Sequence, residues 1–99
     1  MPNWATAYDF ETVTVSSTGI GFTASKYLPS DGSRKATTAL LTVEGDSLRF
    51  RLDGTAPTAA IGHLVPAGGS LTLEGYDNIK NFRAIRVTTD ATVRVSFMR

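Results

Sequence analysis

The sequence predicts a single all-β domain, an antiparallel β-sandwich or jelly-roll-like barrel of seven to eight short strands. Its 99 residues correspond to one domain. Apolar and polar residues alternate with a period of two in segment after segment, and turn residues separate these segments at intervals of about 8–12 residues. Apolar spacing of three and four residues, which a helix would need, extends over no long window.

Six segments carry the alternation most clearly. They are residues 12–16, 20–26, 39–44, 48–52, 70–76 and 92–98. In the last of these, Val93, Val95 and Phe97 share one face, while polar residues occupy the positions between them. Such a pattern is typical of antiparallel strands with one buried and one solvated face.

Turn residues are expected to end each strand. Gly45-Asp46 predicts a two-residue hairpin that joins 39–44 to 47–53. Further breaks are expected at Asp53-Gly54, Pro57, Pro66 with Gly68-Gly69, and Asp90. Residues 28–36, LPSDGSRKA, predict an exposed loop, and residues 77–81 predict a single helical turn.

Residues 1–10 are predicted to form an N-terminal arm ahead of a β-domain at 11–99. The arm contains Trp4, Tyr8 and Phe10, and exposed disordered tails rarely keep three aromatic residues. Two interpretations stay open: the arm packs on its own domain or on a neighbouring subunit. It lacks the basic and apolar regions of a signal peptide.

Composition argues against several classes of protein. The net charge of +1 carries no clustered basic excess, so we expect no nucleic acid partner. The absence of cysteine excludes a disulfide scaffold and thiolate metal sites. No apolar run approaches the ~18 residues of a membrane span, so we expect no membrane partner.

His63 is the only histidine and the first candidate for catalysis. A catalytic triad is defined by geometry, and no nucleophile-elbow motif is present. His63 alternates with Ile61 and Val65, which favours a partly buried ring hydrogen-bonded to a turn at the corner that follows residues 49–52. One histidine cannot supply the three or four ligands of a zinc site. We therefore expect no catalytic residue, no metal and no cofactor.

Arg49 and Arg51 project from one face of one predicted strand. They could bind carboxylates of a partner protein, because the arginine fork suits that contact. They could also pair with Glu44, Glu74 or Asp77 of the same chain, where each pair would stabilise the fold by about 0.2–1 kcal/mol. This intramolecular interpretation is favoured. Gly62 is expected to permit close approach of another part of the backbone.

Several motifs together resemble a known group of proteins. They are the run 39–44, the Arg-x-Arg strand 49–51, Asp53-Gly54-Thr55-x-Pro57-Thr58, Gly62-His63, the turn Gly69 to Leu71, and Phe82-Arg83-x-Ile85. With these motifs, residues 11–98 resemble small proteins encoded among the virion structural genes of tailed phages and prophages.

The resemblance implies a virion component that is made in the host cytoplasm. The role it favours is a capsid decoration (cement) protein, a homo-oligomer, preferably a trimer, that bridges neighbouring major capsid subunits. Contacts are then expected from Trp4, Tyr8, Phe10, Arg34, Lys35, Arg49 and Arg51. The alternatives are a tail, neck or fibre-base protein, or a small carbohydrate- or ligand-binding module that uses the aromatic rings of Trp4, Tyr8, Tyr27 and Tyr76.

Overall fold

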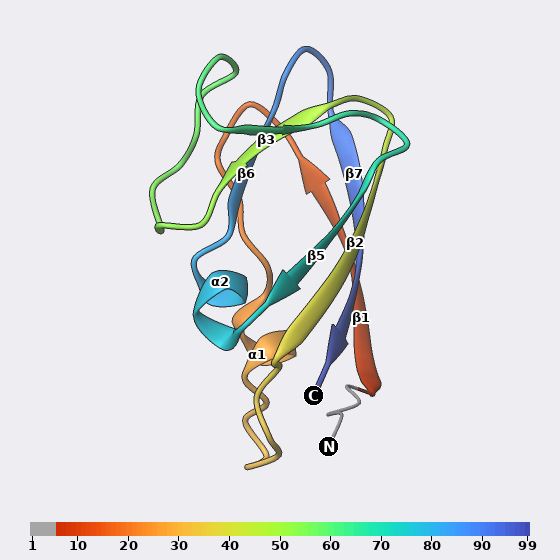
Figure 1. The fold of residues 1–99 in the computed structure, drawn as a ribbon, viewed down its shortest axis with the longest axis vertical. Helices are drawn as coiled ribbons and strands as arrows, with labels where there is room; N and C mark the ends of the chain where they lie inside the picture. Colours follow the sequence, from red (N-terminus) through yellow and green to blue (C-terminus); the bar gives the residue numbers. More distant parts are fainter. Residues whose placement is uncertain (1–5) are drawn as a thin grey trace.

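Seven antiparallel strands divide between two sheets that face each other (Figure 1). The chain is described here by a computed structural model covering residues 6–99. Its elements are β1 (Ala7–Val15), α1 (Ala24–Tyr27), β2 (Thr38–Glu44), β3 (Leu48–Arg51), β4 (His63–Val65), β5 (Ser70–Glu74), α2 (Tyr76–Lys80), β6 (Arg83–Arg86) and β7 (Ala91–Met98). The predicted all-β, sandwich-like class is confirmed.

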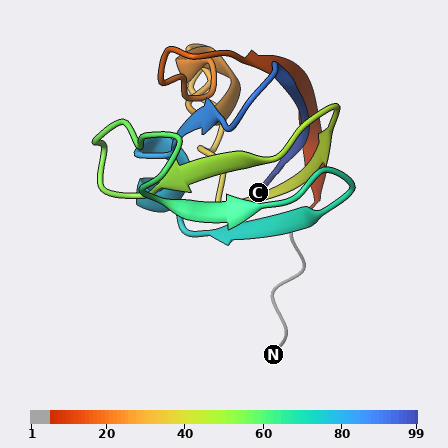
Figure 2. The same ribbon diagram turned by 90° about the horizontal axis from the view of Figure 1, so that it is seen from above.

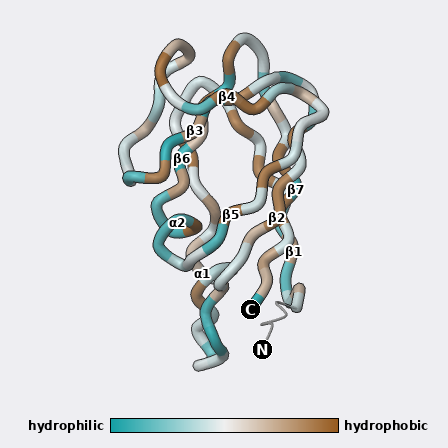
Figure 3. Tube along the Cα trace, viewed as in Figure 1, coloured by the Kyte–Doolittle hydropathy of each residue, from teal (hydrophilic) through white to brown (hydrophobic). Residues whose placement is uncertain are grey.

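The larger sheet has the strand order β1-β7-β2-β5, and the smaller sheet has the order β4-β3-β6. Residues in register across the larger sheet form rows that are buried together. Val13 pairs with Val93, which pairs with Val43, and all three side chains are buried. Since side chains alternate along each strand, the residues between them face solvent. Along the strands the hydropathy of the trace alternates accordingly (Figure 3).

Four phenylalanine rings fill the space between the sheets. Phe22 stacks on Phe82 with ring centroids 4.6 Å apart, and Phe82 lies 5.6 Å from Phe50. Phe97 meets the edge of Phe22 at 5.5 Å. Offset and edge-on arrangements of this kind stabilise a core beyond the area that they bury.

The strand predicted at residues 20–26 is wrong. Only Ile20 forms a bridge, to Ala84, and the chain turns into α1 four residues later. Phe22 does point into the core, so the alternation identified its face correctly. The segment cannot continue as a strand because the Tyr8 hydroxyl donates to the Lys26 carbonyl, 2.6 Å away, and holds the helical turn against β1.

The hairpin predicted at Gly45-Asp46 is also wrong. β2 and β3 follow each other in sequence, yet they belong to different sheets, so these two residues form a corner that crosses the sandwich. The Asp46 carboxylate accepts hydrogen bonds from the backbone N–H groups of Thr88 and Thr89, at 2.9 and 2.7 Å. These contacts tie the corner to the connection between β6 and β7, which crosses between the same sheets.

Residues 7–10, expected in a separate arm, form the first part of β1. A register shift between Ala7 and Asp9 makes a bulge there. Thr6 and Arg99 exchange two backbone hydrogen bonds, at 3.0 and 3.1 Å, so the described chain begins beside its own C-terminus (Figure 1). This part of the predicted arm therefore packs on its own domain. Trp4 lies outside the described residues.

The two sheets are joined at one side and open at the other. The chain after β1 runs along β6, where the Arg86 N–H donates to the Ser16 carbonyl at 3.0 Å and Ile20 exchanges two hydrogen bonds with Ala84. At the opposite side, β4 ends one sheet and β5 ends the other, without pairing. Seen from above, the β4 and β5 ribbons run next to each other along this open side (Figure 2).

Two local predictions are confirmed. Residues 28–36 form a loop that is mostly exposed, although Ala36 is buried and its N–H donates to the Tyr27 carbonyl at 2.8 Å. The helical turn expected at 77–81 is α2, which begins one residue earlier and buries Ile79. Both features lie at the end of the sandwich near the chain termini (Figure 1).

Candidate functional site

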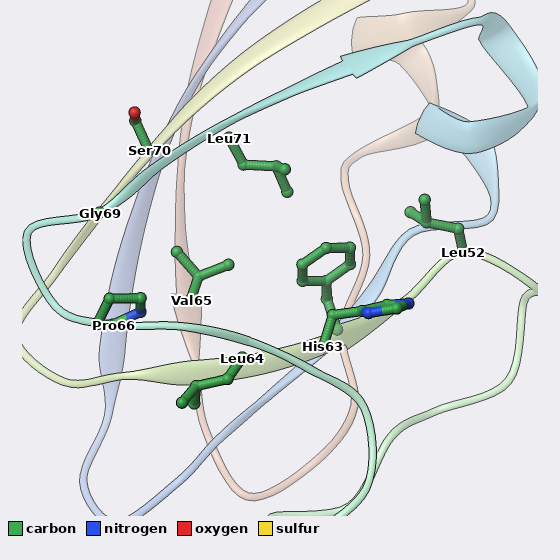
Figure 4. Close-up of a pocket in the computed structure, with 9 residues that line it drawn as sticks. Leu52, His63, Leu64, Val65, Pro66, Gly69, Ser70 and Leu71 are labelled. Carbon is green, nitrogen blue, oxygen red and sulfur yellow. The ribbon is translucent and has the colours of Figure 1, made fainter.

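The open side of the sandwich carries an apolar groove between β4 and β5, here called the seam groove. It has a volume of about 360 Å³. Its lining residues are Phe50, Leu52, His63, Leu64, Val65, Pro66, Gly69, Ser70 and Leu71. Leu71 and Val65 point toward the space between the strands, whereas Ser70 points away from it (Figure 4). The groove thus has an aliphatic floor.

The turn between β4 and β5 creates this groove by sending the chain from one sheet to the other. Pro66 ends β4, since a proline cannot donate to a strand ladder. The Gly69 N–H then closes a turn onto the Pro66 carbonyl at 2.9 Å, and the Gly68 N–H donates to the Val43 carbonyl at 2.8 Å. Gly68 has a φ of 86°, which favours glycine. The next strand is therefore attached to β2 rather than to β4.

One edge of β5 lacks a strand partner within residues 6–99. Gly75 donates to Thr37 and Val43 donates to Gly69 on the β2 side. Since hydrogen-bonded positions alternate in an antiparallel pair, the N–H and C=O groups of Ser70 and Thr72 point to the free edge. The Asn78 side chain already donates to the Glu74 carbonyl at 2.8 Å. The unpaired edge is thus short and lies beside the groove.

His63 does not occupy the predicted environment. It is exposed, and its ring packs against Phe50 with centroids 5.2 Å apart. Among residues 6–99 the structure assigns no hydrogen-bond partner to this ring, so the predicted bond to a turn is wrong. The reason is that β4 is an edge strand, which leaves its first residue at the rim of the sheet.

A polar depression of about 450 Å³ continues from His63 past Leu52 to Arg51 and Asp53. Arg51 forms an ion pair with Asp53 two residues away. Hydrogen bonding from Arg51, followed by the Thr55 N–H, lowers the pKa of the Asp53 carboxyl. Arg51 therefore pairs with a carboxylate of its own chain. The expected partners Glu44, Glu74 and Asp77 are wrong, since the partner is Asp53 and Glu44 pairs with Arg94 instead.

Arg49 binds the loop that follows its own strand. Its Nε donates to the Ala59 carbonyl and its Nη1 to the Gly62 carbonyl, both at 3.0 Å. Gly62 has a φ of 139°, and an added Cβ would lie 2.9 Å from the Cβ of Pro57. The predicted close approach at Gly62 is confirmed. The stretch from Arg49 to His63 is a corner that the two Arg49 hydrogen bonds hold in place.

Of the other predicted contact residues, Tyr8 and Arg34 both contact Arg99, whereas Phe10 lies on the outer face of the larger sheet. Tyr8 is half-buried with the Arg99 guanidinium 4.1 Å above its ring, and burial raises the pKa of its hydroxyl while Arg99 opposes that rise. Lys35 lies 4.4 Å from the Tyr76 ring, and the Arg34 carbonyl accepts from Arg99. Phe10 is 51% exposed on the outer face of the larger sheet. The fold does not bring these residues together into one site.

Phe10 instead shares its surface with a residue that the sequence analysis did not select. Both Phe10 and Leu40 pair in register with Ser96, so they flank it on the outer face of the larger sheet. Leu40 is 41% exposed. The sequence did contain a signal for Leu40, because the alternation of residues 39–44 places it on the face opposite the buried residues. Phe10, Ser96 and Leu40 are called the outer-face row below.

Within residues 6–99, no group of three or more His, Cys, Asp or Glu side chains is placed to bind a metal ion. No helix in that part of the chain is long and apolar enough to cross a membrane. Tyr27 and Tyr76, considered for sugar stacking, pack on each other with centroids 5.9 Å apart.

Comparisons with known proteins give no match. No protein-family model, no curated protein and no solved structure matches the chain.

Proposed function

We propose that the chain is a structural component of a tailed-phage virion, a capsid decoration protein that bridges neighbouring major capsid subunits. The observation that carries the proposal is the outer-face row. Phe10 and Leu40 expose large apolar side chains on the outer face of the larger sheet, and exposed apolar side chains grouped on one surface favour contact with another protein. The motifs between residues 39 and 85 support the phage assignment by their resemblance to virion proteins.

The size of this face indicates how such a protein would bind. Four strands at about 4.8 Å spacing and about 25 Å length present roughly 480 Å². A stable interface buries about 800 Å² per partner. A single contact through this face would therefore be weak. Attachment to a capsid would depend on several copies or several contacts acting together, since multivalency multiplies a modest affinity.

The inner structure suits a mechanical role. The core is closed by stacked phenylalanine rings, and the corners at Asp46 and Arg49 are fixed by hydrogen bonds to distant backbone groups. A rigid body of this kind loses little conformational entropy on binding. It can hold two capsid subunits at a fixed separation.

Cosedimentation with expanded capsids tests the proposal. The protein should bind saturably and raise the temperature at which the capsids disrupt. The double variant Phe10→Ser, Leu40→Ser should lose most of the binding. Ile61→Ser removes a still more exposed apolar side chain, 63% accessible, from the loop after β3, so it serves as the matched control and should bind normally. Absence of the chain from purified virions would refute the proposal, and a small fixed copy number would indicate a tail or neck protein.

A further inference from the structure

The seam groove has the properties of a site for one extended, uncharged segment of polypeptide. His63 is the only ionisable residue in its lining, and the remaining lining residues are apolar or small. Leu64 is 53% exposed at its rim. Beside the groove, the backbone groups of Ser70 and Thr72 are available to pair with an added strand. An incoming charge would meet no opposite charge in the lining.

The chain itself contains a segment of matching chemistry. Residues 1–5, MPNWA, carry no charged side chain and include Trp4, the only tryptophan of the protein. They precede Thr6, where the described chain begins. Tryptophan supplies a large apolar area with few rotatable bonds, which suits it to fill a groove at an interface.

We propose that residues 3–5 of a second copy add as a strand along the free edge of β5, with Trp4 inserted into the seam groove. In this arrangement Asn3 and Ala5 pair with Thr72 and Ser70 through backbone hydrogen bonds. Trp4 lies opposite Leu71, whose side chain points into the groove (Figure 4). Directly opposed residues of an antiparallel pair share a face, so this register places the indole against the aliphatic floor.

Pro2 is compatible with the same register. It would lie opposite Leu73, a position whose backbone groups bond toward β2 and away from the free edge. An added strand needs no N–H donor there. Proline is tolerated at edge positions for this reason.

The donor must be a second copy because the distance within one chain is too great. Thr6 pairs with Arg99, and the same row of the sheet continues through Thr37 to Gly75. Leu71 is four residues farther along β5, which puts it about 19 Å from Thr6 on a flat sheet. Trp4 is two residues from Thr6, so its backbone extends at most about 7 Å from it. The remaining gap exceeds the length of the indole side chain.

Trp4 fluorescence reports directly on this contact. We expect blue-shifted emission that iodide quenches poorly at high protein concentration, and red-shifted, readily quenched emission on dilution, in step with the mass measured by light scattering. Leu64→Glu introduces a charge at the groove rim and should give the red-shifted, low-mass form at all concentrations. Leu28→Glu changes another leucine of similar exposure, 50%, outside both the groove and the outer-face row, so it is the matched control and should behave as the original chain.

Mixing two variants separates exchange between copies from other effects. Trp4→Ala keeps an intact groove but lacks the indole, and Leu64→Glu keeps the indole but has a damaged groove. Each alone should be monomeric, whereas the mixture should form a pair of chains with blue-shifted emission. Circular dichroism confirms that Leu64→Glu is folded.

Three results would overturn the proposal: emission that does not depend on concentration, a mixture that stays monomeric with red-shifted emission, or loss of association in Leu28→Glu but not in Leu64→Glu. None of these measurements uses a capsid. Failure of the arm exchange is therefore distinguishable from failure of the decoration role.

Discussion

The Arg49 guanidinium donates from Nη1 to the Gly62 carbonyl, 3.0 Å away, and so joins β3 to the residue just before β4. Its Nε holds the Ala59 carbonyl in the same loop. Two carbonyl groups three positions apart in the chain are thus fixed by one planar side chain. This arrangement explains how the connection between β3 and β4, residues 52–62, keeps a defined path without secondary structure of its own.

Replacement of Arg49 should loosen that connection. Arg49→Ala removes both hydrogen bonds, and we expect the free energy of unfolding to fall by about 1–2 kcal/mol, since the side chain is half-exposed. Arg49→Lys should recover only part of the loss, because an ammonium group cannot reproduce the planar fork. Urea denaturation measures the free energy of unfolding, and limited proteolysis measures how fast the loop is cleaved at residues 54–61. If both variants are as stable as the original chain, the Arg49 hydrogen bonds do not stabilise the loop.

Gly62→Ala should be more damaging than Gly68→Ala. Both residues have positive φ values, 139° and 86°, so each substitution strains the backbone by about 1 kcal/mol. A Cβ at position 62 would also lie 2.9 Å from Pro57 and 3.2 Å from Arg49, whereas position 68 is open within 4 Å. We expect a loss above about 2 kcal/mol for Gly62→Ala from the added overpacking. Thermal unfolding compares the two variants directly.

Asp46 should make folding stability depend on pH. Hydrogen bonds from the Thr89 N–H and then the Thr88 N–H lower the pKa of its carboxyl. A lowered folded-state pKa stabilises the protein above the unfolded value of about 3.9, and this contribution is lost as the pH falls through the folded-state pKa. Asp46→Asn should therefore be less stable than the original chain near pH 6, with a difference that shrinks below pH ~4.

Urea midpoints measured from pH 7 down to acid test that dependence. Asp77→Asn on α2 removes one exposed negative charge elsewhere and controls for the change in net charge. A difference between Asp46→Asn and the original chain that stays constant across the whole range would refute the assignment.

Substitution of two phenylalanines should change the stability to very different extents. Phe97 is fully buried and meets Phe22 edge-on, so Phe97→Ala should cost about 3–5 kcal/mol of unfolding free energy. Phe10 is half-exposed on the outer-face row, so Phe10→Ala should change stability by less than about 1 kcal/mol. Chemical denaturation of both variants provides the measurement. A large loss in Phe10→Ala would indicate a structural rather than a binding role.

Some of the candidate site was accessible from the sequence and some was not. Alternation in residues 39–44 placed Leu40 on the solvent side, and Gly62 was identified as a point of close approach. The seam groove was not predicted, because it depends on β4 and β5 ending different sheets. β4 has only three residues, too few for a period of two to be distinguished from a loop. The environment of His63 was predicted wrongly because this residue begins the same short edge strand.

The sequence by itself determined the all-β class, the buried face of β1, β2, β3, β5 and β7, and the position of the loop at 28–36. Side-chain alternation and turn chemistry are local properties, so they are readable without a partner strand. Only the tertiary structure decided which sheet each strand joins, that Gly45-Asp46 is a corner, and that residues 24–27 form a helical turn. Those outcomes depend on contacts between residues far apart in the chain, such as Asp46 with Thr88 and Tyr8 with Lys26, whose free energies no local pattern encodes.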